Sequence, residues 1–137
     1  MINSNEFIKC INDYFEFLIT EFGFKTYEKK IIGNVFYDIQ YKDNSRVISI
    51  SYENIEDYLI ITVFILQNGE LPNYDDKTKT LHLKKLNELI FLKASKEDIN
   101  LNTKYFNKYT PKNELDKKLI KEAMELRLCL KYFNEVF

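Results

Sequence analysis

The residues that could perform chemistry in this chain are few and widely spaced. The only histidine, His82, lies between two leucines, and the two cysteines, Cys10 and Cys129, are 119 positions apart. Nucleophilic catalysis needs a nucleophile beside a base, and a zinc site needs a closely spaced set of thiolates and imidazoles. We therefore predict no catalytic residue and no metal site, and we interpret His82 as a structural or surface histidine. We also predict no disulfide between the two cysteines, because we expect the protein to lie in the reducing cytoplasm.

Phosphate-binding loops are also missing from the sequence. The three glycines, Gly23, Gly33 and Gly69, stand singly and form none of the glycine-rich patterns that hold nucleotides. The sequence therefore predicts no nucleotide cofactor.

Paired carboxylates are the remaining chemical feature. Glu53, Glu56 and Asp57 form one group, and Asp75 with Asp76 forms a second. Such groups can bind a cation or transfer protons, but with 21 acidic residues in 137 they also arise as solvated turns. Neighbouring tyrosines could serve as anchors for a protein partner. The predicted partner-binding residues are Tyr52, Glu53, Glu56, Asp57, Tyr58, Tyr74, Asp75 and Asp76.

Charge and hydropathy favour a protein partner over other classes. The net charge is −1 and the pI is about 5.9, which argues against a general nucleic-acid binder. No apolar run approaches the roughly 20 residues that span a bilayer. The N-terminal residues MINSNEF lack the pattern of a signal peptide. We therefore expect a cytoplasmic protein without a nucleic-acid or membrane partner.

The N-terminal residues have the pattern of a capped helix. Asn3 and Glu6 have capping-box spacing, and an apolar stripe follows as far as Phe22. Gly23 is placed to end that helix in a left-handed conformation, with Phe22 and Phe24 packing on either side. The stripe consists of Phe7, Ile11, Tyr14, Phe15, Leu18 and Phe22.

Residues 24–66 predict four antiparallel strands. Alternation runs from Val35 to Tyr41 and from Ile48 to Tyr52, with turns at 33–34, 42–45 and 53–57. Residues 24–32 form an edge strand protected by lysines. Residues 58–66 are apolar at nearly every position, so we expect a central strand covered on both faces.

The remainder of the chain predicts helices. Thr80 is expected to cap a helix that ends near Leu92, and residues 95–98 a short helical turn, while residues 93–112 otherwise have no clear pattern. Pro111 and Asn113 open a long C-terminal helix. The prediction is a single α+β domain, residues 1–137. It has an N-terminal helix, a four-stranded antiparallel meander and C-terminal helices packed on the sheet.

The long C-terminal helix has a second apolar stripe, formed by Ile120, Met124 and Leu128. A helix that is apolar on two sides is either enclosed in a core or in contact with another chain. We favour the core, and hence a protein that is a monomer when free, with a homodimer as the alternative.

Three segments resemble a known pattern. They are EFGF at residues 21–24, VFY at 35–37 and ISISYE at 48–53. Over residues 7–66 this arrangement is similar to small bacterial immunity proteins of polymorphic-toxin and contact-dependent inhibition systems. The resemblance implies a protein without catalytic activity that binds and blocks a cognate toxin domain.

Two other functions fit the same sequence. One is a small acidic secretion or assembly chaperone that works as a dimer, and the other is a carboxylate-dependent hydrolase. Of the three, we favour the immunity protein, with the eight residues above as its partner-binding face.

Overall fold

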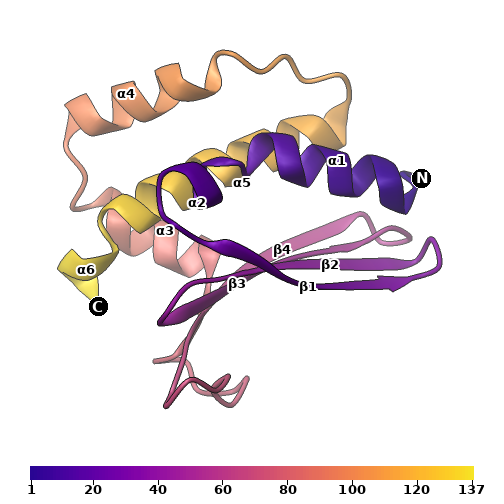
Figure 1. Cartoon of the computed structure of the whole chain (residues 1–137). Coiled ribbons are helices and arrows are strands. Elements are labelled where there is room, and N and C mark those ends of the chain that lie inside the picture. Colours follow the sequence, from indigo (N-terminus) through magenta and orange to yellow (C-terminus); the bar gives the residue numbers. More distant parts are fainter. The chain divides into compact units, whose positions relative to one another are not determined.

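The computed structural model describes all residues, 1–137, and divides them into two compact units. Residues 1–82 contain two helices and the sheet, and residues 83–137 contain helices only (Figure 1). This composition confirms the predicted α+β class. Each unit is described separately below.

Helix α1 (Ser4–Tyr14) begins as the sequence predicted. The Asn3 side chain accepts a hydrogen bond from the Glu6 amide at 2.9 Å and donates one to the Glu6 carboxylate at 2.7 Å. The prediction of one continuous helix to Phe22 is wrong, because α1 ends at Tyr14 and a short helix α2 (Phe17–Thr20) follows. Phe17 lies off the apolar stripe of a straight helix, and the break allows it to be fully buried beside Phe15.

The glycine that ends this helical region behaves as predicted. Gly23 has φ of +72°, a conformation that costs glycine little. The next amide, of Phe24, donates to the Leu18 carbonyl at 2.8 Å, and the Phe24 ring is buried. The turn therefore brings the chain into the first strand with a buried aromatic anchor.

The sheet is an antiparallel meander in the order β1-β2-β3-β4-β5, so the predicted order is confirmed but the count of four strands is one too few. The missing strand, β5, has only three residues and pairs with the middle of β4. Its first residue is Thr80, so Thr80 does not cap a helix. The strands are β1 (Lys25–Ile32), β2 (Phe36–Lys42), β3 (Arg46–Glu53), β4 (Tyr58–Ile65) and β5 (Thr80–His82).

Strand β1 is the exposed edge that the sequence predicted. All eight of its residues are exposed, and its pairing with β2 has a register shift between Thr26 and Lys29. Strand β4 lies between β3 and β5, but the prediction that it is covered on both faces is wrong. Only Ile61, Thr62 and Val63 are buried in it, and Tyr58 is 56% exposed.

One face of the sheet packs against α1 and forms the core of residues 1–82 (Figure 1). The Phe7 ring lies 5.2 Å from the Tyr37 ring and 5.5 Å from the Tyr52 ring. Burying such aromatic side chains removes a large apolar area from water, which stabilises the pairing of β2 with β3. The same face continues through the buried cross-strand pairs Tyr37–Tyr52, Ile39–Ile50, Tyr41–Ile48, Ile50–Ile61 and Ile48–Val63.

Residues 83–137 form four helices, of which α3 and α4 both pack on α5. They are α3 (Leu83–Phe91), α4 (Lys96–Phe106), α5 (Glu114–Lys131) and α6 (Phe133–Val136). The predicted short turn at residues 95–98 is the start of α4, whose Ser95 cap accepts from the Asp98 amide at 3.1 Å. The region that the sequence left open, residues 93–112, thus contains a helix of 11 residues.

The predicted start of the long helix is confirmed. The Asn113 side chain accepts from the Asp116 amide at 2.8 Å, and the Asp116 carboxylate accepts from the Lys112 amide at 2.9 Å. The second apolar stripe is divided: Leu128 is buried, whereas Ile120 and Met124 are only half-buried. Our expectation of a core position for all three is therefore correct for Leu128 alone.

Candidate functional site

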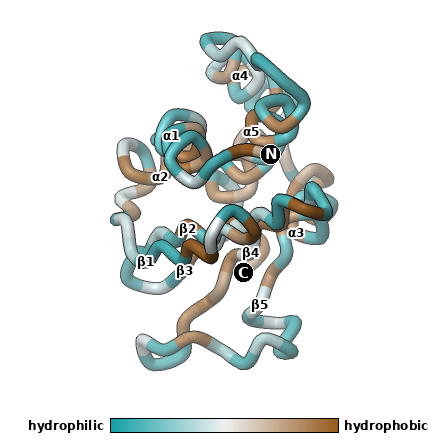
Figure 2. The backbone as a smooth tube through the Cα atoms, turned by 90° about the vertical axis from the view of Figure 1, so that its right-hand side faces the viewer, coloured by the Kyte–Doolittle hydropathy of each residue, from teal (hydrophilic) through white to brown (hydrophobic).

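The face of the sheet opposite α1, called the outer face below, is the candidate site. Residues that pair across antiparallel strands point to the same side of a sheet. The register therefore places Asp38 beside Ser51, Gln40 beside Ser49, and Ser49 beside Thr62 on this face. The loop between β4 and β5 lies on this side and α1 on the other (Figure 2).

One end of the outer face is formed by the turn between β3 and β4. Glu53 and Tyr58 pair across this turn, and Phe36 pairs with Glu53 from the other side. Ile55 and Glu56 are exposed at the tip, Ile55 at 66%. An exposed aromatic and an exposed aliphatic side chain thus stand beside two carboxylates, a combination typical of binding surfaces.

This turn is held rigidly by the buried side chain of Asn54. Its amide nitrogen donates to the Asn34 carbonyl at 2.8 Å and to the Ile2 carbonyl at 2.7 Å. The Tyr52 hydroxyl donates to the Asp57 carboxylate at 2.6 Å, while Asp57 itself has φ of +51°. Burial and this hydrogen bond raise the pKa of Tyr52 well above its usual range. The exposed groups of the turn are therefore presented in one conformation.

A row of polar side chains crosses the centre of the outer face. The Asp38 carboxylate accepts hydrogen bonds from Ser49 at 2.6 Å, from Ser51 at 3.0 Å and from the Gln40 amide at 2.8 Å. The row continues to β4 and β5, where Thr62 Oγ1 lies 3.1 Å from His82 Nδ1. Four strands thus contribute side chains to one polar row.

The loop between β4 and β5 covers the far end of this row. The Tyr74 ring lies 5.6 Å from the His82 ring and 6.4 Å from the Phe64 ring, and Tyr74 remains 60% exposed. The Asp76 carboxylate accepts from the hydroxyl and the amide of Thr78, which lowers its pKa. Asp75 is exposed beside it. Tyrosine and carboxylates therefore also lie at this second end.

The eight predicted residues do not form one compact cluster. Glu53, Glu56, Asp57 and Tyr58 lie at one end of β4, and residues 74–76 follow its other end, about 23 Å away along an eight-residue strand. Tyr52 is buried beneath α1 at 4% exposure, so its ring is part of the core and not of the surface. The outer face connects the two groups.

Sequence reasoning did not single out the polar row between these two groups. The period of two marks Asp38, Gln40, Ser49 and Ser51 only as polar positions that alternate with apolar ones. This pattern runs from Asp38 to Lys42 in β2 and from Ser49 to Glu53 in β3. Their meeting around one carboxylate depends on the strand register.

The two units carry opposite charges. Residues 1–82 contain eight Lys and Arg and thirteen Asp and Glu, a net charge of −5. Residues 83–137 contain twelve Lys and Arg and eight Asp and Glu, a net charge of +4. The net charge of the whole chain is close to zero because an acidic unit and a basic unit nearly cancel. The outer face belongs to the acidic unit, residues 1–82.

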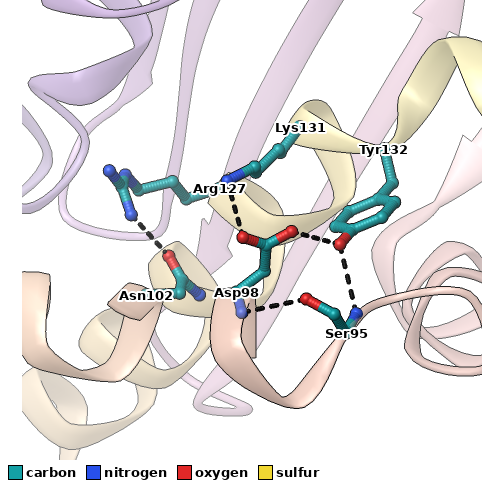
Figure 3. A network of polar contacts seen from close by, with 6 residues as sticks. All are labelled: Ser95, Asp98, Asn102, Arg127, Lys131 and Tyr132. Carbon is teal, nitrogen blue, oxygen red and sulfur yellow. Dashed lines mark hydrogen bonds and ion pairs between the residues drawn. The ribbon is translucent and has the colours of Figure 1, made fainter. Parts of the chain in front are cut away.

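The helical unit has a polar network of its own, which joins the start of α4 to the end of α5 (Figure 3). The Asp98 carboxylate accepts from the Tyr132 hydroxyl and from Lys131, the latter at 3.0 Å. These two contacts lower the pKa of Asp98. Nearby, Asn102 donates to the Met124 carbonyl at 2.8 Å and accepts from Arg127 at 2.9 Å. Every partner lies on α4, on α5 or at their ends, so the network fastens these helices together.

A groove of about 380 Å³ lies between α3 and α5. Its lining includes Glu122, whose pKa is raised to about 7 by burial and by the neighbouring Glu125. Lys121 forms an ion pair with Glu125 at 2.9 Å. The groove is therefore a mixed-charge surface in which one carboxyl is poorly solvated.

The cysteines and the other possible metal-ligating side chains form no further candidate site. Neither cysteine forms a disulfide. Cys10 is half-buried on α1, and Cys129 is buried on α5, where burial raises its pKa to about 12. Nowhere in the structure do three or more metal-ligating side chains gather. None of the helices combines the length and apolar character that crossing a membrane requires.

Comparison with known protein families, with curated proteins and with solved structures finds no significant match to this chain.

Proposed function

We propose that this chain is a non-catalytic binding protein that neutralises a cognate bacterial toxin domain by occluding it, acting in the cytoplasm as a monomer when free. The observation that carries the proposal is the turn between β3 and β4, where exposed Ile55 and Tyr58 stand beside Glu53 and Glu56 on a rigid support. Rigid presentation lowers the entropy lost on binding, and exposed aromatic side chains are common binding anchors.

The charge of residues 1–82 supports the same proposal. Toxin domains that act on nucleic acid need positive charge around their sites, because they bind a polyanion. An inhibitor with a net charge of −5 in the unit that carries its outer face gains association rate and orientation against such a domain. The acidic residues at both ends of the outer face are then steering groups, and the exposed side chains of Ile55, Tyr58 and Tyr74 provide apolar contact area.

The test is co-expression with the toxin domain encoded by the reading frame adjacent to this chain's own. We expect the chain to restore growth and to bind the purified toxin domain in calorimetry. The double variant Glu53→Lys with Glu56→Lys should slow association about tenfold or more at low salt, with a smaller effect at high salt.

A matched control has the same change of charge away from the outer face. Glu16 and Glu21, at the two ends of α2 on the α1 side of the sheet, are both exposed, so Glu16→Lys with Glu21→Lys should leave association nearly unchanged. Circular dichroism would verify that both variants are folded. The proposal is wrong if the toxin domain is not bound. If both double variants slowed association equally, the partner-binding surface would not be centred on the β3–β4 turn.

A further inference from the structure

Asp38 is an uncompensated carboxylate at the centre of the outer face. Its three hydrogen-bond donors, Ser49, Ser51 and Gln40, are all neutral. Lys30 is its cross-strand neighbour on β1 but is exposed and forms no ion pair with it. Arg46, the one arginine of residues 1–82, pairs with Asp43 at 2.8 Å. The negative charge of Asp38 is therefore oriented by its neighbours without being neutralised.

Asp38 and Gln40 have acceptor positions that no hydrogen-bond donor of the protein fills. A carboxylate offers about four acceptor positions, and the three donors of Asp38 occupy three of them. Gln40 donates its amide nitrogen to Asp38, while its oxygen Oε1 is buried and has no hydrogen-bond partner. A buried polar atom without a partner costs free energy, so a donor that reached both groups would be favoured.

Half-buried apolar side chains flank this carboxylate. Phe36 precedes Asp38 by two positions on the same face of β2, and Ile60 pairs with Ser51 on β4. A cationic side chain with a planar head and an apolar stem fits such surroundings, because its stem can pack on these walls while its head reaches the carboxylate. Arginine meets both requirements, since its guanidinium has five donors in a rigid plane.

We propose that the outer face binds an arginine side chain of the partner protein, with Asp38 as the direct ligand and Ser49, Ser51 and Gln40 as positioning residues. This inference rests on the proposed function in one respect, that the toxin domain contacts this face. It adds the chemistry of the central contact: a charge-assisted hydrogen bond from the guanidinium to the one free acceptor position of a carboxylate that the protein has already oriented.

The first experiment uses N-acetyl-arginine amide as the probe, titrated into the full chain and followed by backbone amide chemical shifts. We expect saturable shifts at Asp38, Ser49 and Ser51, and at least tenfold weaker binding in Asp38→Asn, which keeps the shape but removes the charge. Glu28→Gln, which removes an exposed carboxylate from the neighbouring strand, should bind the probe like the parent chain. Unchanged probe affinity in Asp38→Asn, or shifts centred elsewhere, would overturn the inference.

The second experiment separates this inference from the proposed function. If the toxin domain binds the parent chain, Asp38→Asn should weaken that binding at least tenfold, and Ser51→Ala should weaken it less. Toxin binding that is unaffected by Asp38→Asn would reject the arginine contact and leave the proposed function standing. If the toxin domain is not bound at all, the proposed function fails, and the arginine titration still decides whether the Asp38 site recognises guanidinium.

Discussion

The two units of the chain use their polar side chains in different ways. In residues 1–82, Asp38 and its serine partners lie on an outer face of the sheet, and the buried Asn54 fixes a turn that exposes other groups. In residues 83–137, the Asp98 and Asn102 side chains are bonded to groups on the neighbouring helix. The unit of residues 1–82, the sheet unit, therefore has polar side chains on an outer surface. In residues 83–137, the helical unit, the polar side chains are bonded to one another between helices and hold those helices together.

The charges of the two units follow the same division. The sheet unit has a net charge of −5, and the helical unit has a net charge of +4. This difference in charge is one reason why our proposed partner-binding face lies on the sheet. Four sets of substitutions test that comparison, beginning with the largest expected effect.

Phe7→Ala should destabilise the sheet unit most. The Phe7 ring is fully buried between Tyr37 and Tyr52, so its removal leaves a cavity under both strands that carry the outer face. We expect a loss of about 3–5 kcal/mol in the free energy of unfolding, measured by urea denaturation. Ile19→Ala, at a residue that is 49% exposed, is the control and should cost less than about 0.5 kcal/mol. Similar costs for the two variants would mean that α1 does not support the sheet.

Leu128 and Met124 should respond differently, although they belong to one apolar stripe. Leu128 is 5% exposed, so Leu128→Ala should cost about 2–4 kcal/mol, whereas half-buried Met124 should lose roughly half as much on the same change. Leu128→Lys should unfold the helical unit and Met124→Lys should leave it folded, as judged by circular dichroism. A folded Leu128→Lys variant would show that this stripe faces solvent or another chain.

Glu122 should make the helical unit less stable as pH rises. Its pKa in the folded chain is raised from 4.5 to about 7, so between these values the folded state binds more protons than the unfolded state. Stability therefore falls as pH rises through this window. Glu122→Gln should be more stable than the parent at pH 8 by about 1 kcal/mol, since solvent screens part of the group, and equal to it near pH 4.

Urea denaturation at the two pH values measures this difference. Glu114→Gln, at an exposed glutamate of the same helix, serves as the control and should show no such pH dependence. A Glu122→Gln effect of the same size at pH 4 and pH 8 would contradict the titration of Glu122 as its cause.

Tyr132→Phe should have the smallest effect. It removes the hydrogen bond to Asp98 and the one that the hydroxyl accepts from the Ser95 amide at 3.1 Å, so the pKa of Asp98 should rise toward its ordinary value of 3.8. Because the lowered pKa stabilises the fold above that value, the variant should lose a little stability at neutral pH and less in strong acid, where only the contact with Ser95 is lost. An NMR titration of the Asp98 carboxyl measures the shift, with Tyr105→Phe as the control. If the pKa of Asp98 were the same in Tyr132→Phe as in the parent chain, Tyr132 would not be a hydrogen-bond donor to Asp98.

Much of the local structure could be predicted from the sequence. The cap of α1 at Asn3, the turn at Gly23 after α2 and the cap of α5 at Asn113 each depend on residues within a few positions of one another. The alternation of β2 and β3 is also local, and it identified the buried residues of the inner face from Tyr37 onward, whereas Val35, the first residue of the predicted alternation, precedes β2 and is 44% exposed. The acidic turns at 53–57 and 75–76 were found for the same reason.

What the sequence could not reveal depends on contacts between distant residues. Strand β5 has only three residues, and it exists because Thr80 and His82 pair with β4. The meeting of Asp38 with Ser49 and Ser51 requires the register set by Tyr37 and Tyr52, a pair buried under Phe7. The sequence by itself therefore determined the order of strands β1–β4, the positions of α1, α3 and α5 and several of their ends, but not β5, the break between α1 and α2, or the extent of α4. Tertiary structure decided which side chains meet, because burial and strand register depend on groups that are far apart in the chain.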